Sequence, residues 1–296
     1  MTILQLKDYY EDLFTKESLQ QIRTASARAL KDTKSRMLEI RNAGQWDALK
    51  IQKYNRLKSL EKDLNKILNN MKTAQFQTIR TANVRLYQEI FNVSKFDAFN
   101  QTNLPIQFAK IDRDAALKAI TNPIPKLNLT EIAARQRQEI VYALQQKLAE
   151  QIISGASYRE TAELVAGIFN NDLNRAEMVV WTENHRVKEL ASLDSIQDTA
   201  ERYKIDIWKI WVATADERTR DDHVEADAQR VKYDEMFEVG NSRGLAPGNM
   251  MGADSAAQNI RCRCTMQEVF SKDADPNYNT SRVDYLKWKK AVTGKR

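Results

Sequence analysis

Two cysteines and a histidine are the residues of this chain whose types and spacing best suit chemistry. Cys262 and Cys264 are its only cysteines, one residue apart in NIRCRCTM, and His223 precedes them. Thiolates and imidazole are ligands that Zn²⁺ accepts in tetrahedral geometry, although Cys-x-Cys is one residue shorter than the usual pair. A carboxylate could complete the set, and the candidates are Asp216, Asp221 and Asp227. A structural zinc at Cys262, Cys264 and His223 is therefore one hypothesis.

Other interpretations of the same residues stay open. Free cysteine behaves as a small buried hydrophobe, and a strand over 261–269 would turn both thiols inward and both arginines outward. A cysteine nucleophile with His223 as its base is another possibility, but the sequence has neither a Gly-x-Ser-x-Gly elbow nor a phosphate-cradling Gly-rich loop. The acidic run from Asp216 to Asp227 could hold a divalent cation or simply be solvated. We expect no enzymatic activity and no obligatory cofactor.

Long helices must position these residues, because Gly and Pro are scarce: eight and five in 296 residues. Apolar side chains recur at intervals of three, four and seven over 16–41 and again over 46–91. This spacing predicts two or three amphipathic helices that pack as an N-terminal hairpin or bundle. The prolines of TNPIPKLNLT (121–130) then predict an extended linker.

The second half of the chain changes from helical to strand-like patterns. We expect a helix over 130–154 that begins at Thr130, one from the capping-box sequence SYRE to about 169, and one over 173–203 capped by Asp172. His185 should be exposed on this last helix. IDIWKIWVAT (205–214) and 261–269 predict antiparallel strands, separated by a weakly structured, Gly-rich region.

These patterns predict a mainly α protein with a small α+β C-terminal domain. The predicted division is a basic helical region over 1–127, a second domain over 128–270 and a tail over 271–296 with a short helix. Residues 18–80 carry 14 Lys and Arg against 5 Asp and Glu, so a polyanion or an acidic protein would meet the chain there. A solvated helical face is the alternative. No apolar run approaches the ~20 residues of a membrane span, so we expect a cytoplasmic protein with reduced thiols.

The order of several short motifs over about 155–266 resembles the phage Mu F-like family of minor head proteins, also called phage head morphogenesis proteins. The motifs include a helical Thr-Glu, Lys-Ile-Trp in a strand, Asp-Glu-Arg-Thr-Arg before a histidine, and Arg-Cys-Arg-Cys at the end. Arg261 stands where the family commonly has Asn. The residues carrying the resemblance are Arg175, Thr182, Glu183, Trp211, Asp216, Arg218, Arg220, His223, Phe237, Cys262, Arg263 and Cys264.

The resemblance implies a structural protein of a tailed-phage or prophage head. Such a protein would associate with the portal protein and procapsid, assist DNA packaging or delivery, and move from the host cytoplasm into the virion head. Double-stranded DNA is a second candidate partner, through residues 18–80, since phosphate binding follows basic charge. We expect Asp216, Arg218 and Arg220 to form charge pairs that hold their loop against Glu183 or a neighbouring carboxylate.

Overall fold

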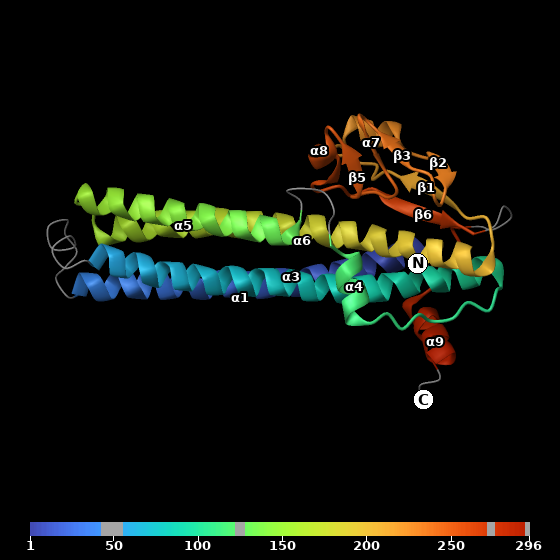
Figure 1. The fold of residues 1–296 in the computed structure, drawn as a ribbon, viewed down its shortest axis with the longest axis horizontal. Helices are drawn as coiled ribbons and strands as arrows, with labels where there is room; N and C mark the ends of the chain where they lie inside the picture. Colours follow the sequence, from blue (N-terminus) through green and yellow to red (C-terminus); the bar gives the residue numbers. More distant parts are fainter. Residues whose placement is uncertain (43–55, 122–127, 271–275, 294–296) are drawn as a thin grey trace. The chain divides into compact units, whose positions relative to one another are not determined.

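The computed structural model describes residues 1–42, 56–121, 128–270 and 276–293, and it is mostly helical, as predicted (Figure 1). The long helices are α1 (Ile3–Asn42), α3 (Arg56–Thr102), α5 (Leu129–Ile153) and α6 (Tyr158–Tyr203). The start of the second predicted helix, over 46–55, and the two linker prolines lie outside the described residues. Both α1 and α3 extend beyond the predicted segments. The aromatic residues Phe91, Phe96 and Phe99 therefore belong to helix α3.

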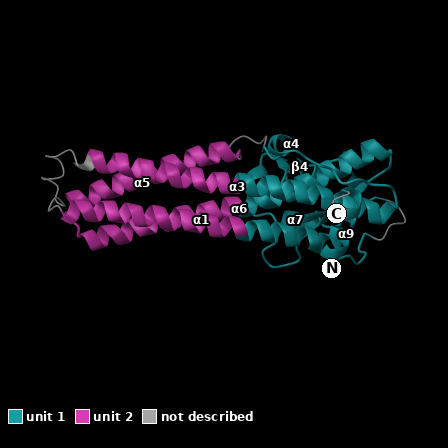
Figure 2. Cartoon of the chain, turned by 90° about the horizontal axis from the view of Figure 1, so that it is seen from below, with its two compact units in different colours: residues 1–16, 80–121, 181–296 teal, residues 17–79, 122–180 magenta. Residues whose placement is uncertain are grey.

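The chain forms two compact units, each built from segments that are distant in the sequence (Figure 2). Unit 1 comprises residues 1–16, 80–121 and 181–296, and unit 2 comprises residues 17–79 and 122–180. Helices α1, α3 and α6 each contribute residues to both units. This interleaved division differs from the linear boundaries at 127 and 270, which stay predictions.

Unit 2 is an all-helical bundle among its described residues. Apolar side chains four residues apart, such as Leu60, Leu64 and Leu68 on α3, face Leu144 and Leu148 of α5 in one buried cluster. This spacing brings them to one face of each helix, which is why the sequence pattern identified the bundle.

Local signals set the ends of two helices in unit 2. Ser157 and Glu160 form the predicted capping box, in which the Glu160 carboxylate accepts from the Ser157 amide at 2.8 Å and the Ser157 hydroxyl accepts from the Glu160 amide at 3.3 Å. Gly155, with φ of +71°, follows the end of α5, where a left-handed residue commonly ends a helix. The helix begins, however, with Asn128 as its cap, two residues before the predicted Thr130.

The predicted break at Asp172 is wrong, because α6 runs without interruption from Tyr158 to Tyr203. Asp172 is buried and forms an ion pair with Lys72 at 2.5 Å. A capping preference competes weakly with a buried ion pair, so the side chain points into the bundle instead of ending the helix.

In unit 1, the first sheet is antiparallel with the order β2-β1-β6, formed by β1 (Trp208–Val212), β2 (Arg230–Lys232) and β6 (Thr265–Val269). Both predicted strands are therefore confirmed in part, the first in its central residues and the second in its last five, with Trp211 opposite Met266. The loop between β1 and β2 contains the short helix α7 (Asp221–Glu225).

The Gly-rich region predicted to be weakly structured forms a second antiparallel sheet. Its strands are β3 (Phe237–Val239), β4 (Ser242–Gly244) and β5 (Met250–Gly252), followed by the short helix α8 (Ser255–Asn259). Gly240, with φ of +55°, turns the chain between β3 and β4. In the sequence, a glycine at such a position predicts a loop. In the structure, the same glycine allows the tight turn of the hairpin.

Further helices of unit 1 precede and follow these sheets in the sequence. The described residues include α4 (Arg113–Ala119) and α9 (Arg282–Thr293), the predicted helix of the tail, which buries Tyr285 and Trp288 against Phe96. Within the described ranges, none of the helices combines the length and the apolar character that crossing a membrane requires.

Candidate functional site

His223, Cys262 and Cys264 come together in unit 1. His223 Nδ1 lies 3.2 Å from Cys264 Sγ and 3.7 Å from Cys262 Sγ, and the three ligand atoms all lie within 4.8 Å of one another. Their exposed fractions are 2 %, 2 % and 4 % for His223, Cys264 and Cys262. Both thiols are free, as expected.

The cysteines occupy an extended segment that leads into β6. The predicted strand over 261–269 is four residues too long at its start, because β6 begins at Thr265 and Arg261 has φ of +54°. The predicted alternation nevertheless holds: both thiols are buried and both arginines are exposed. Successive side chains point to opposite sides of any extended backbone. The alternating burial therefore does not require the hydrogen bonds of a strand ladder.

The hydrogen bonds around His223 determine which of its nitrogens carries a proton. Gln258 Nε2 donates to Asp222 at 2.7 Å and to Asp254 at 3.0 Å, so its Oε1 faces His223 Nε2 at 2.8 Å. Since an amide oxygen only accepts, Nε2 must be the protonated nitrogen. The lone pair of Nδ1 therefore points at the two sulfur atoms.

Aromatic side chains hold the imidazole from the other side. Trp211 is fully buried, and its ring meets His223 edge-on with centroids 5.6 Å apart and Phe237 at 5.5 Å. The predicted positions Trp211 and Phe237 thus form the apolar wall of the site. Such packing restricts the ring to one orientation.

The two thiols share a proton unequally. The Cys262 thiol donates a hydrogen bond to Cys264, and this contact lowers the pKa of Cys264 to about 4 against the opposing effect of burial. The same contact, followed by burial, raises the pKa of Cys262. One sulfur of the pair is therefore predisposed to be a thiolate, the form that binds metals and attacks electrophiles.

Charge pairs hold the loop after β1: the expected pair of Asp216 with Arg218 is present at 3.6 Å, and Arg263 is an additional partner that was not expected. Asp216 accepts two hydrogen bonds from Arg263, at 2.5 and 2.6 Å, and this contact lowers the pKa of its carboxyl well below the usual range. Arg218 donates its backbone amide to Asp216, and Arg220 donates to the Ile260 carbonyl at 2.5 Å.

Glu183 does not contact this loop, and this part of the expectation is wrong. It is buried and forms an ion pair with Arg186, one turn along α6, at 2.9 Å. Thr182 accepts from the Arg261 amide at 3.3 Å, whereas Arg175 belongs to unit 2 and pairs with Glu139 at 2.5 Å. Two of the three proposed fourth ligands are engaged elsewhere, Asp216 by Arg263 and Asp227 by the Ala213 amide at 2.8 Å, and the third, Asp221, is exposed.

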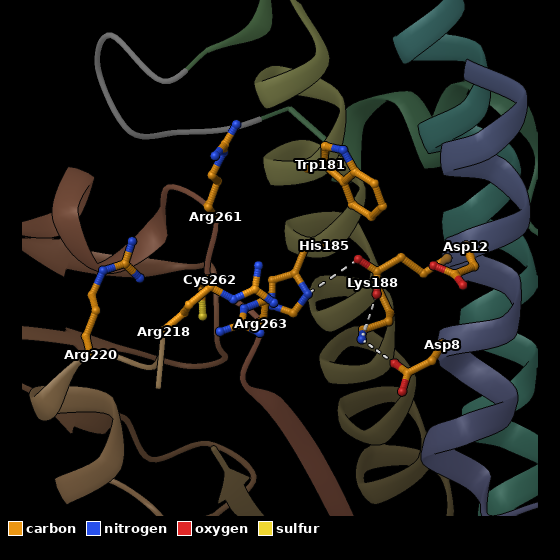
Figure 3. A pocket seen from close by; sticks show the side chains of 11 residues that line it. Asp8, Asp12, Trp181, His185, Lys188, Arg218, Arg220, Arg261, Cys262 and Arg263 are labelled. Carbon is orange, nitrogen blue, oxygen red and sulfur yellow. Dashed lines mark hydrogen bonds and ion pairs between the residues drawn. The ribbon is translucent and has the colours of Figure 1, made fainter. Parts of the chain in front are cut away.

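A cavity of about 750 Å³ lies beside the cysteines, with Cys262 in its wall (Figure 3). Guanidinium groups line one part of it and carboxylates of α1 line another. The charged residues of the wall are Asp8, Glu11, Asp12, His185, Lys188, Arg218, Arg220, Arg261 and Arg263.

His185 is buried beside this cavity, which corrects the expectation that it is exposed. It lies 3.5 Å from Glu11. Lys188, also buried, contacts Asp8 and Glu11 at 2.8 Å each and Glu189 at 3.4 Å. Glu189 in turn accepts from the Met266 amide at 2.9 Å, so this network ties α6 to β6.

Neither the Gln258 contacts nor this network was predicted from the sequence. The signal for the network was present in NHRVKE (184–189), where four ionisable residues fall within five consecutive positions and must therefore spread around the helix. Another missed residue is Asn259, whose buried amide exchanges two hydrogen bonds with the backbone of Met250, at 2.7 and 2.8 Å, and so fixes α8 to β5. No sequence spacing pairs these two residues in advance.

Comparison with known proteins relates the chain to phage proteins. Residues 142–267 match the family described as Phage Mu protein F like protein. The chain is 26 % identical over 260 residues to the minor head protein GP7 of Bacillus phage SPP1, covering 81 % of this chain and 80 % of that one. It is also 24 % identical over 214 residues to the NAD(+)–arginine ADP-ribosyltransferase EFV of Enterococcus faecalis, covering 72 % of this chain and 43 % of that enzyme. No solved structure matches it.

Proposed function

Since this chain belongs to the phage Mu F-like family through residues 142–267, we propose that it is a structural minor head protein of a tailed phage or prophage. In this role it associates with the portal protein inside the procapsid and becomes part of the virion head after assembly in the host cytoplasm. The observation that carries the proposal is the alignment with the SPP1 minor head protein, which covers about four-fifths of both chains.

The placement of the family motif residues supports a structural role. Trp211, Phe237 and Glu183 are buried, and Asp216 and Arg263 pair with each other. Side chains that pack and pair in this way maintain the shape of a surface. A head component needs such a surface to recognise its neighbours.

Co-expression with the cognate portal protein tests the association. We expect a complex that survives size-exclusion chromatography. The charge-neutral variant Asp216→Asn should weaken the complex if the loop before α7 forms part of the interface, whereas Asp206→Asn, an exposed position before β1, should leave it intact. If the two proteins elute separately under all salt conditions, the proposed portal association is wrong.

We further propose that unit 2 contacts packaged DNA. By sequence, unit 2 carries 19 Lys and Arg against 13 Asp and Glu, so the net charge of +6 resides there, and unit 1 is neutral. Basic side chains of α1 and α3 remain exposed, and a basic helical surface attracts phosphates without reading bases. The exposed basic residues chosen for the test are Arg28, Lys31, Lys62 and Lys66.

Substitution of these four exposed residues by Glu tests the DNA contact without changing the buried side chains of unit 2. Affinity for duplex DNA should fall steeply, and the slope of log affinity against log salt should become shallower. The matched control reverses four exposed lysines of unit 1: Lys110, Lys204, Lys287 and Lys290. Equal losses in both variants would show that the binding follows total charge and not unit 2.

We propose that the chain is not an enzyme. The aligned transferase is matched over 43 % of its length, and its activity is a property of that whole protein. Incubating the full chain with labelled NAD⁺ and an arginine-rich acceptor should leave the acceptor unlabelled. Labelling that disappears in His223→Ala, with helix content unchanged, would replace this proposal with a catalytic one.

A further inference from the structure

We propose that His223, Cys262 and Cys264 bind one zinc ion, which joins α7 to the segment leading into β6. This inference rests on the side-chain geometry alone and does not depend on the proposed role in the phage head. It assigns three ligands: the imidazole Nδ1 and two thiolates.

The distances between the ligand atoms suit a tetrahedral ion. With Zn–N of about 2.0 Å and Zn–S of about 2.3 Å, neighbouring N and S ligands lie roughly 3.5 Å apart. The two N···S separations in the structure, 3.2 and 3.7 Å, lie on either side of this value. Small side-chain rotations are enough to place an ion between the three atoms.

The protonation of His223 is already the one that a metal requires. Gln258 accepts the Nε2 proton, so the Nδ1 lone pair faces the sulfur atoms. Asp222 and Asp254 orient the Gln258 amide in turn. Metal-binding histidines usually carry such a second hydrogen bond, which fixes the tautomer and the ring orientation. Gln258 is therefore a positioning residue.

The backbone leaves room for this arrangement at Gly240. A Cβ atom added there would lie 2.5 Å from Asp222 Oδ2 and 2.9 Å from Gln258 Nε2. The β3–β4 turn thus passes directly over the two groups that orient His223. Together with the Trp211 ring beneath the imidazole, this packing holds the donor in place before any ion arrives.

The fourth coordination position belongs to an oxygen donor from solvent. Among the described residues, His223, Cys262 and Cys264 are the group whose ligand atoms are close enough to share an ion. Cys262 also lines the cavity of about 750 Å³, which gives water access to this side of the site. Three protein ligands and one solvent ligand are a known form of zinc coordination.

Metal analysis of the full chain, purified without chelators and then dialysed against Zn²⁺, is the direct test. We expect about one zinc per chain, since the site holds a single ion. Cys264→Ser and His223→Gln should each lose most of the metal. Asp206→Asn, at an exposed position before β1, is the matched control and should retain it.

Cobalt substitution keeps the test decisive if the ligand variants fail to fold. The Co²⁺ form of the unaltered chain should show thiolate-to-cobalt charge-transfer absorption that excess Zn²⁺ abolishes. Zinc binding should also raise the thermal midpoint, because an ion that binds only the folded state stabilises it by mass action.

Gln258→Leu separates a positioned metal site from two thiols that merely pack beside a histidine. Loss of the Nε2 acceptor should raise the zinc dissociation constant about 10–100-fold. In a site that only packs, Gln258→Leu would leave zinc uptake unaltered. A chain that takes up no zinc and shows no thiolate–cobalt absorption would overturn the proposal, whatever its behaviour toward portal or DNA.

Discussion

The two units of this protein stabilise themselves in different ways. Unit 2 is a bundle whose buried clusters consist of Leu, Ile, Met, Val, Ala and Phe, and its described residues bury one ion pair, Lys72 with Asp172. Unit 1 buries many ionisable side chains beside its apolar core. They are Lys7, Lys95, Asp97, Glu183, His185, Arg186, Lys188, Glu189, Lys209, His223 and Glu268.

The net charge of the two units follows the opposite order to their buried charges. Unit 2 carries the whole excess of +6, whereas unit 1 is neutral and buries several of its charged side chains. A charged surface attracts partners at long range, while buried pairs fix which elements pack together. The comparison therefore separates a basic scaffold from a unit whose interior is specified by polar contacts.

The largest expected effect comes from Lys188→Met in unit 1. This change leaves Glu11 and Glu189 buried without their shared cation, which should cost about 3–5 kcal/mol of unfolding free energy. Urea unfolding followed by tryptophan fluorescence measures it, because four of the five tryptophans belong to unit 1.

Lys72→Met is the matched change in unit 2. It strands a single carboxylate, Asp172, whose pKa burial already raises, so protonation can relieve the loss and the cost should be smaller. Circular dichroism follows the unfolding of unit 2 better than tryptophan fluorescence does, because the described residues of this unit are helical. Equal costs for the two variants would mean that the buried charges of unit 1 are no more tightly coupled than the single pair of unit 2.

Asp97 should make the stability of unit 1 depend on pH. Burial, and then the nearby charge of Glu268, raise the pKa of Asp97 from 3.8 to about 8. Because the folded pKa is the higher one, this contribution is complete below about pH 4 and is lost as the pH rises through about 8. The thermal midpoint should therefore fall over this range.

Asp97→Asn tests this pH dependence with a side chain of nearly the same shape. The variant should lose most of the fall in thermal midpoint between pH 5 and 8, a range set by the pKa of about 8. Asp206→Asn, at an exposed position of the same unit, should leave the profile unaltered. An unchanged slope in Asp97→Asn would assign the effect to another group.

The smallest expected effect concerns a helix cap of unit 2. Ser157→Ala removes the hydroxyl that accepts from the Glu160 amide at the start of α6, which should cost about 1 kcal/mol. Ser154→Ala is the control, because its hydroxyl donates to the Gln151 carbonyl and caps no amide. A loss in Ser157→Ala as large as that in Lys188→Met would remove the distinction between the units.

Much of unit 2 could be predicted because its stability follows local periodicity. The leucines of α3 recur at helical spacing, and SYRE is a complete capping box within four residues. The exception is Asp172. Its partner, Lys72, lies a hundred positions away in the sequence. The local pattern therefore predicted a helix cap at Asp172, whereas the structure has a buried ion pair there.

The site in unit 1 was predicted in part. Residue types alone selected His223, Cys262 and Cys264, and the alternation of the RCRC segment gave the correct burial. The partners of Asp216 and Glu183 could not be predicted, because several cations of the sequence suit each carboxylate equally. Burial of His185 was missed for the same reason, since Glu11 belongs to a different helix.

The sequence by itself determined the helical bundle, the central strands, the family resemblance and the three candidate ligands, because each of these depends on residue type or short-range spacing. Only the tertiary structure decided that Gln258 turns the His223 lone pair toward two sulfur atoms, and that Asp216 pairs with Arg263 while Glu183 pairs with Arg186. Hydrogen bonds and ion pairs between distant segments depend on where the backbone brings them together. The spacing of residues along the sequence does not show which distant segments will be in contact.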